Sequence, residues 1–172
     1  MTNLARVRPV SAHGRAEERA DLTYFCTHCG SLSDPPEGSA ERPHRGRVCP
    51  QCSLGVILMC ARATLDVEGA AFLVVTADLR ISAASEAAER YFRITDGLYG
   101  RPLLSVMTSP DGIGELARHV VRAASGTRQP VTVPVEAAAS KLPNGRIDVR
   151  IGRCASPPAA LVVVDGISSL RE

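Results

Sequence analysis

The sequence predicts an α+β protein in which a small cysteine-rich N-terminal module precedes a larger antiparallel sheet with helices on one face. Three observations lead to this expectation. Two Cys-x-x-Cys pairs lie within residues 21–62, apolar stretches of strand length follow residue 68, and an amphipathic helix interrupts those stretches. We expect residues 1–20 to be a flexible segment, residues 21–62 to form the module and residues 68–168 to form the larger domain.

The length of 172 residues suits one ordinary domain and a small one. Aromatic residues make up 3% and Trp is absent, so the core must consist mainly of Val, Leu, Ile and Ala. A formal net charge of +2 is too neutral for a protein that binds nucleic acid by electrostatics. Residues 1–20 lack the apolar region of a signal peptide, and the longest apolar run, residues 54–61, is too short to span a bilayer. We therefore expect a cytoplasmic protein without a membrane segment.

The cysteine pairs have the spacing of a four-thiolate metal site. Two residues within each pair let the chain curl so that both sulfurs reach one ion. Gly30 and the stretch Ser53-Leu54-Gly55 follow the pairs, and such small residues let backbone N–H groups turn toward the sulfurs. A four-sulfur tetrahedron leaves no position open for substrate, so we expect a structural Zn²⁺ in a zinc ribbon and not a metal-dependent enzyme. The expected ligands are Cys26, Cys29, Cys49 and Cys52.

Other uses of these cysteines have less support. Two disulfides would suit a secreted chain, and the missing signal peptide argues against them. A rubredoxin-type iron site uses the same ligands, but the aromatic residues that surround such sites are absent. His28 or His44 could replace one sulfur; with four thiols available, we interpret both imidazoles as solvated loop residues. Cys60 and Cys154 stand alone in apolar stretches, which is typical of small buried hydrophobic residues.

Three strands are expected first. After a loop over residues 34–39, residues 55–60 form the strand that follows the second cysteine pair. Residues 71–75 are an unbroken apolar strand, and beyond a turn at Ala77-Asp78 residues 80–83 return as a shorter strand.

Two helices are expected next. Ser85 offers an N-cap oxygen to a short helix with apolar residues at helical spacing. A longer helix, from about residue 112 to 125 and capped by Asp111, carries one apolar stripe. The stripe consists of Ile113, Leu116, Ala117, Val120, Val121 and Ala124.

Three strands complete the domain. Residues 131–135 and 147–151 alternate apolar and polar side chains, and a turn at Pro143-Asn144-Gly145 joins them. Residues 160–164 form another unbroken apolar strand. Continuous apolar strands in an antiparallel sheet indicate that both faces are covered. We expect helices on one face, and the metal module, the N-terminal segment or a second copy of the chain on the other.

This order of strands and helices resembles that of a PAS domain. The resemblance covers about residues 68–168; residues 71–107 look like the family's opening, and Gly100-Arg101-Pro102-Leu103 is the most specific piece. Ser85 stands where the family often has Asn, and Leu79 replaces a common Gly. The resemblance implies a PAS-like five-stranded antiparallel sheet whose first and last strands are central. With its zinc ribbon, the chain resembles bacterial stand-alone PAS-domain regulatory proteins.

The resemblance also bears on cofactors. Flavin-binding photoreceptor members carry a reactive Cys at the place of Leu103, and haem-binding members place an axial His on the long helix. His119 lies about 140° from the centre of the apolar stripe, so we expect it to face solvent. We therefore expect neither haem nor flavin, and a small-molecule ligand stays unidentified. Residues that could line a pocket are interpreted as ordinary core: Val75, Phe92, Leu104, Leu116 and Val133.

Neither a phosphate-binding loop nor a nucleophile elbow occurs in the sequence, so we expect no enzyme. Our first interpretation is a regulatory or sensory protein that acts through protein contacts, with the sheet face presented to a partner or a second copy. The alternative is a transcription-associated zinc ribbon that binds nucleic acid through Arg42, Arg45 and Arg47. Three arginines are few for that task, and we interpret them as offsetting the charge of Zn²⁺ bound by four thiolates. A thiol sensor that releases zinc on oxidation is a third hypothesis.

Overall fold

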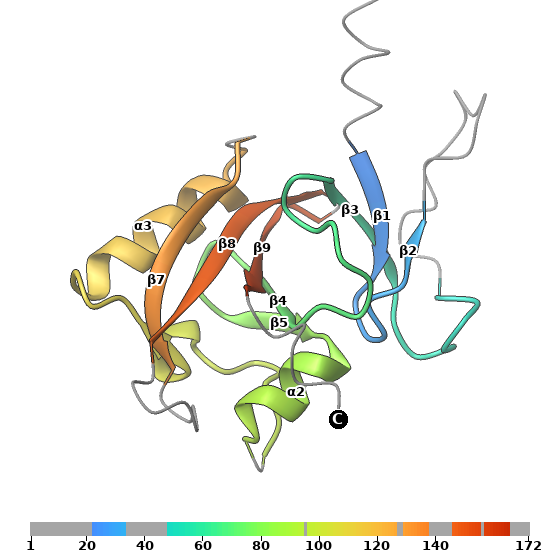
Figure 1. Ribbon diagram of the computed structural model, residues 1–172, viewed down its shortest axis with the longest axis horizontal. Coiled ribbons are helices and arrows are strands. Elements are labelled where there is room, and N and C mark those ends of the chain that lie inside the picture. Colours follow the sequence, from blue (N-terminus) through green and yellow to red (C-terminus); the bar gives the residue numbers. More distant parts are fainter. Residues whose placement is uncertain are drawn as a thin grey trace, which may run out of the picture.

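The computed structural model describes residues 22–33, 48–94, 96–126, 129–137, 146–155 and 157–165. Within these ranges the chain has a mixed α/β fold with a mostly antiparallel sheet and few helices (Figure 1). The elements are β1 (Leu22–Cys26), β2 (Leu32–Ser33), β3 (Ile57–Ala61), β4 (Phe72–Val75), β5 (Ile81–Ala84), α2 (Glu86–Phe92), the 3₁₀ turn η1 (Leu103–Ser105), β6 (Met107–Thr108), α3 (Ile113–Ala124), β7 (Val131–Ala137), β8 (Arg146–Ala155) and β9 (Ala159–Val164).

The strands of the cysteine module and of the larger domain belong to one continuous sheet. Its order is β2-β1-β3-β8-β9-β4-β5, and β7 pairs with β8 while β6 pairs with β7. One edge of β8 is shared, because β7 pairs with residues 146–151 and β3 with Cys154 and Ala155. The sequence indicates two separate parts; the β3–β8 pairing joins them.

The two unbroken apolar strands lie side by side in the sheet. β4 and β9 pair over four residues, with β5 on the far side of β4 and β8 on the far side of β9. Every residue of both strands is buried. The expectation that both faces of these strands are covered is therefore confirmed.

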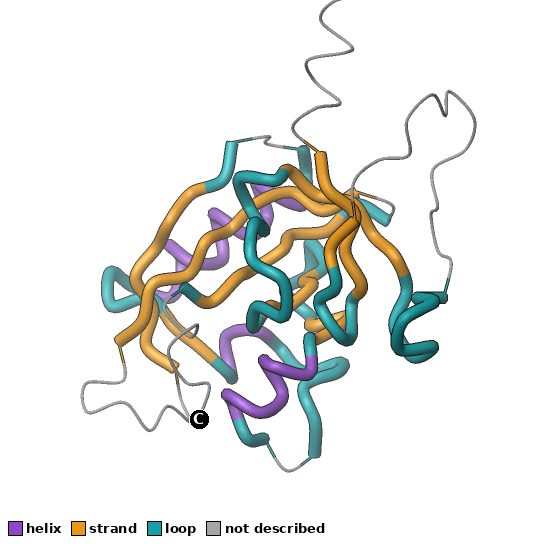
Figure 2. The backbone as a smooth tube through the Cα atoms, turned by 45° about the vertical axis from the view of Figure 1, so that its right-hand side comes forward, coloured by secondary structure: helices purple, strands orange, loops and turns teal. Residues whose placement is uncertain are grey.

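The central strands bury their side chains in two clusters, one on each face. On β4, Leu73 and Val75 belong to the inner cluster, which also contains buried residues of α2, η1 and α3. Phe72 and Val74 point the opposite way, as the period of two along a strand requires. Figure 2 shows α3 on one side of the strands and loop segments on the other. The outer cluster consists of Phe25, Leu58, Cys60, Leu65, Phe72, Val74, Cys154, Ala159, Leu161 and Val163.

The cysteine module covers the outer face of the sheet. Phe25 of β1 and Leu58 of β3 are direct partners across their ladder, and both belong to the outer cluster. Leu65 adds a third apolar side chain from the segment of residues 62–70, which crosses in front of β9 and β4 in Figure 1. The helices and the module thus take opposite faces of the same strands.

Ser85 caps α2, as the sequence predicts. Its Oγ accepts a hydrogen bond from the Ala88 N–H at 3.2 Å. The same oxygen accepts from the Phe72 N–H at 3.0 Å and donates to the Ala70 carbonyl at 2.9 Å. One hydroxyl therefore ties the start of α2 to the start of the central strand β4.

The prediction that Asp111 caps α3 is wrong. The helix begins at Ile113, and Gly112 occupies the N-cap position with φ of 113° and no side-chain hydrogen bond. Asp111 lies one residue too early for its carboxylate to reach the free N–H groups of the first turn. Its own N–H donates to Ser109 Oγ at 3.2 Å instead.

The buried face of α3 is rotated from the expected one. Ile113 is 65% exposed and Val121 is 38% exposed. His119, expected to face solvent, is half-buried: its side chain is 24% exposed and its Nε2 lies 2.9 Å from Glu115 Oε1. A sequence pattern counts all apolar residues equally, whereas the sheet covers only part of the helix surface. The buried positions are Leu116, Val120, Ala123 and Ala124.

The residues considered as a pocket lining belong to the core. Val75, Phe92, Leu116 and Val133 are buried in the inner cluster, and Leu104 packs against it. Other expectations concern residues outside the described ranges: the segment 1–20, the loop 34–39, the arginines between 42 and 47, His44 and the turn at 143–145. In the described part of the chain, no helix has the length and apolar character needed to cross a membrane.

Candidate metal centre

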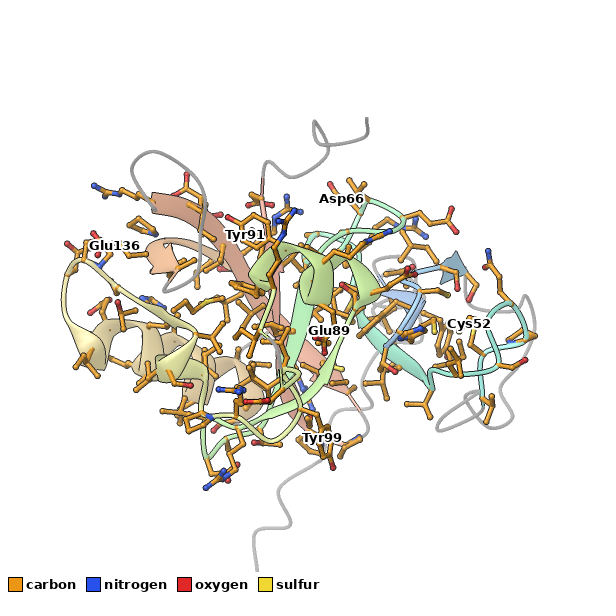
Figure 3. All side chains as sticks on the ribbon, turned by 90° about the horizontal axis from the view of Figure 1, so that it is seen from below. Cys52, Asp66, Glu89, Tyr91, Tyr99 and Glu136 are labelled. Carbon is orange, nitrogen blue, oxygen red and sulfur yellow. The ribbon has the colours of Figure 1, made fainter. Side chains whose placement is uncertain are left out.

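The two cysteine pairs come together at one end of the sheet. Cys26 is the last residue of β1 and Cys29 lies in the turn that follows, while Cys49 and Cys52 lie in the loop before β3. The four sulfur atoms all lie within 4.8 Å of one another. Figure 3 shows Cys52 at one end of the molecule and Glu136 of β7 at the other. The four residues expected as ligands therefore form one cluster.

The sulfur spacing matches a tetrahedral ion site. Zn–S bonds of about 2.3 Å in a tetrahedron place neighbouring sulfurs about 3.8 Å apart. The Cys26 and Cys52 sulfurs are 3.6 Å apart, and the Cys29 and Cys49 sulfurs are 3.9 Å apart. These separations far exceed a disulfide bond of about 2 Å. All four cysteines are free thiols here.

Hydrogen bonds hold the two knuckles to each other without help from the sulfurs. The Thr27 N–H donates to the Val56 carbonyl, and the Val56 N–H donates to Thr27 Oγ1, both at 3.0 Å. Val48 and Val56 form a bridge around the second pair, and the Cys49 N–H donates to the Gly55 carbonyl at 2.7 Å. The backbone thus preorganises the four sulfurs.

Backbone N–H groups point at the sulfurs, as the small residues after each pair led us to expect. The His28 N–H donates to Cys26 Sγ at 3.4 Å. N–H groups of Gly55 and Leu54 bond to the Cys52 sulfur and lower the pKa of that thiol to about 6. Such bonds stabilise thiolate, which is the form that binds a metal.

The other pKa shifts in the cluster reflect burial as well as hydrogen bonding. Burial raises the pKa of Cys26 to about 12, although bonds from the His28 and Cys29 N–H groups oppose this. Burial would also raise the pKa of Cys49, but N–H bonds from Cys52 and Gln51 outweigh it and the net pKa is lowered. The pKa is therefore raised at Cys26 and lowered at Cys49 and Cys52.

Gly55 is required by close packing. A Cβ at this position would lie 2.4 Å from Cys26 Sγ and 2.7 Å from the His28 nitrogen. Gly30 has φ of 71°, a conformation that favours glycine, and its Cβ would meet Gly69 at 3.2 Å. Both glycines allow backbone to approach the sulfurs or the adjoining loop.

Sequence reasoning missed two polar partners of the cluster. Ser31 Oγ accepts a hydrogen bond from Cys29 Sγ at 3.3 Å and lies 3.7 Å from Cys49 Sγ. Thr27, which is buried, joins the knuckles as described above. Both residues are adjacent to a cysteine pair, and a hydroxyl beside a Cys-x-x-Cys motif is the signal that could have identified them.

The first knuckle also contacts the larger domain. The Glu86 N–H, at the first residue of α2, donates to the His28 carbonyl at 2.7 Å. The Gly69 N–H donates to the Gly30 carbonyl at 3.2 Å. His28 is half-buried and acts here through its backbone, and its imidazole is not part of the cluster. The shape of this turn is therefore coupled to the start of α2.

The remaining two cysteines are buried, as expected. Cys60 of β3 and Cys154 of β8 are direct partners in the antiparallel ladder, and both belong to the outer cluster. Burial raises the pKa of both thiols, to about 12 at Cys154. They are inert small hydrophobic residues while they stay covered.

The fold and the site together define a mixed α/β protein with a four-cysteine cluster compatible with a structural metal ion. No protein-family model matches the chain, and no curated protein matches it.

Proposed function

We propose that this chain is a non-enzymatic regulatory protein with a PAS-like sheet domain, in which a zinc ribbon holds one structural Zn²⁺ and the protein acts through protein contacts. The observation that carries this proposal is the cluster of four sulfurs at tetrahedral spacing, which sits beside an apolar sheet face. A closed four-sulfur site stabilises a short module that could not bury a core of its own.

The strand order supports the PAS-like domain. Taken alone, the larger domain runs β5-β4-β9-β8-β7, so its first and last strands are the central neighbours. Its helical elements lie in the chain between β5 and β7, and their buried residues belong to the inner cluster. This is the arrangement that the sequence resemblance implies.

The donor set supports zinc. Four clustered thiolates suit Zn²⁺ or iron, and Zn²⁺ is the usual occupant of structural sites of this kind. N–H groups at three of the sulfurs offset part of the negative charge that four thiolates bring to one ion.

The pairing of the charged side chains supports a protein that acts by binding partners and not by catalysis. Many carboxylates of the described residues are paired on the surface, for example Glu86 with Arg90 and Asp96 with Arg101. Glu115 pairs with both Arg118 and His119. These carboxylates therefore serve local structure.

Metal analysis with native mass spectrometry tests the metal site. We expect one zinc per chain in the wild type and in Cys60→Ala, whose sulfur lies outside the cluster. Cys29→Ala should lose the metal. Cobalt substitution should give the intense thiolate-to-metal absorption of a tetrahedral four-sulfur site. A chain that folds fully without metal, or that holds iron, would contradict the zinc assignment.

A gel shift at two salt concentrations separates the proposed function from its alternative. We expect no retained complex between the zinc-loaded chain and duplex DNA. Binding that weakens steeply as salt rises would instead favour the nucleic-acid-binding zinc ribbon. Cross-linking of the full chain in cell extract should separately identify a protein partner.

A further inference from the structure

The outer sheet face can meet a partner only if it is uncovered, and in this structure the cysteine module covers it. Few backbone contacts fasten the module to the sheet. β3 pairs with β8 through only two residue pairs, Met59 with Ala155 and Cys60 with Cys154. The first knuckle adds the hydrogen bonds from Glu86 and Gly69 described above. The other contacts between module and sheet are the apolar ones of the outer cluster, so closure depends on the module keeping its folded shape.

We propose that the cysteine module is a metal-held cover: bound metal keeps it closed on the outer cluster, and loss of metal opens it and exposes the central strands. This inference rests on the proposed metal site and adds a regulatory role to it. The exposed surface would include Phe72, Val74, Leu161 and Val163, and the thiol of Cys154 beneath them.

The metal should control whether the module stays closed, because an apolar contact of the module lies directly beside a metal ligand. Phe25 precedes the ligand Cys26 and packs edge-on against Phe72, with ring centroids 5.2 Å apart. Without an ion, the sulfurs of Cys26 and Cys52 lose their common partner, and beyond the end of the β1–β3 ladder the knuckles keep the Thr27–Val56 bonds. Unfolding of such a short element without its metal is the usual behaviour of structural zinc sites.

The rest of the domain has its own core. The inner cluster combines β4, β8 and β9 with α2, η1 and α3, and it contains no residue of β1, β2 or β3. Ser85 fastens α2 to β4 independently of the module. Opening of the cover therefore leaves the helical side of the sheet folded.

The chain contains its own reporter for this opening. Cys154 of the sheet is 0% exposed and Cys60 of the module is 2% exposed, and both belong to the outer cluster between the module and the sheet. While covered, they cannot reach a reagent, and burial also keeps them protonated, since it raises the pKa of both. Cys154 belongs to the sheet and not to the module, so its reactivity reports the uncovering of the sheet.

The experiment compares maleimide labelling of the full chain with zinc bound and after removal of zinc by a chelator in reducing buffer. Maleimide adds the thiol across its double bond, so nothing leaves and each labelled cysteine gains one reagent mass. We expect Cys154 to react at least about tenfold faster after zinc removal, because local opening controls access. Helical circular dichroism and hydrogen-exchange protection of α3 should persist. Zinc added back before labelling should restore protection.

Two variants, one in the outer cluster and one in the inner cluster, each remove an apolar side chain while zinc stays bound. Phe25→Ala weakens the cover and should speed labelling of Cys154. Leu116→Ala, in α3 of the inner cluster, should have a smaller effect on Cys154. Equal effects of the two variants would overturn the cover, because labelling would then report only global unfolding.

The possible failures are distinguishable. A chain that binds neither zinc nor cobalt refutes the metal site itself. A chain that binds metal but keeps Cys154 protected after metal removal refutes the cover and leaves the metal site intact. Loss of α3 protection together with the metal also refutes the cover, since the module would then be integral to the fold.

Discussion

Gly55 shows how a single missing side chain permits the metal centre. Its backbone passes so close to Cys26 Sγ and to the first knuckle that a Cβ would overlap with both. At the same place, its N–H bonds to the Cys52 sulfur and lowers the pKa of that thiol. The residue therefore contributes through close approach and through a donor, and the close approach requires glycine or a shift of the loop.

We predict that Gly55→Ala weakens metal binding by at least about tenfold, in line with the loss seen when outer-sphere partners of a metal site are changed. Competition with a chromogenic chelator measures the affinity. Gly114→Ala is the matched control, because a Cβ at Gly114 in α3 meets no atom within 4 Å. The control should leave the metal affinity unchanged and stabilise the helix by about 0.5–1 kcal/mol. Equal affinity of Gly55→Ala and wild type would contradict the role of close approach.

A second residue-scale feature is a buried hydroxyl without a partner. Thr64 is fully buried, and its Oγ1 makes no hydrogen bond within the described residues. The side chain packs against Gly152 of β8, where a Cβ would lie 2.1 Å from Oγ1. Burial of an unpaired hydroxyl opposes folding.

We predict that Thr64→Val raises the free energy of unfolding by about 1 kcal/mol, since a methyl group replaces an unpaired hydroxyl of the same shape. Urea denaturation of the zinc-loaded protein measures this. Thr23→Val is the control: Thr23 is also buried, but its Oγ1 donates to the Ser33 carbonyl at 3.4 Å. That variant should lose about as much as the first gains. Destabilisation by Thr64→Val would show that the hydroxyl has a partner.

At the scale of elements, the segment of residues 62–70 is fastened to the sheet by Arg150 of β8. The guanidinium donates to the Ala63 carbonyl at 3.2 Å, to Asp66 at 3.0 Å and to Asp165 at 2.9 Å. Burial alone would lower the pKa of Arg150, but the two carboxylates outweigh it and the pKa is raised. One side chain therefore anchors a loop and the end of β9 to the outer face.

We predict that Arg150→Met lowers the free energy of unfolding by about 1–2 kcal/mol, because three charge-assisted bonds are lost from a largely covered site. Arg90→Met is the control: its pair with Glu86 is exposed on both sides, and its loss should cost at most about 0.5 kcal/mol. Hydrogen exchange at the Thr64 and Leu65 amides should speed only in the Arg150 variant. Equal losses in both variants would contradict the anchor.

The elements also show how far the sequence pattern reaches. Strands β4 and β9 follow from unbroken apolar runs, and α2 follows from Ser85 and the helical spacing behind it. The start of α3 does not, because Gly112 and Asp111 are both acceptable N-cap residues on sequence alone. The turn in which the Asp111 N–H donates to Ser109 Oγ makes Gly112 and not Asp111 the N-cap residue.

At the scale of the whole molecule, the outer sheet face is covered by the chain's own cysteine module, and not by solvent or a partner. Phe72, Val74 and Val163, which point to this face, are all buried within one chain. Coverage by a second copy is therefore not needed to keep these strands dry. The pairing of β3 with β8 places the cover and the sheet in one continuous structure.

We predict that the zinc-loaded chain is a monomer at micromolar concentration, with a mass of 18.2 kDa plus the metal. Light scattering after size-exclusion chromatography measures this mass. A dimer that survives dilution would contradict the prediction. Tyr99→Ser would then test whether Tyr99, at 80% the most exposed large apolar side chain among the described residues, mediates that contact.

The sequence by itself determined the four cysteines, the longer strands and the two helices of the larger domain, and the need to cover both faces of β4 and β9. These features depend on residue type and local spacing: a Cys-x-x-Cys pair curls the chain, and a continuous apolar strand must be buried on both sides. Only the tertiary structure decided what lies on the outer face. That choice depends on contacts between residues far apart in the chain, such as Phe25 with Phe72 and Cys60 with Cys154, and no periodicity encodes them.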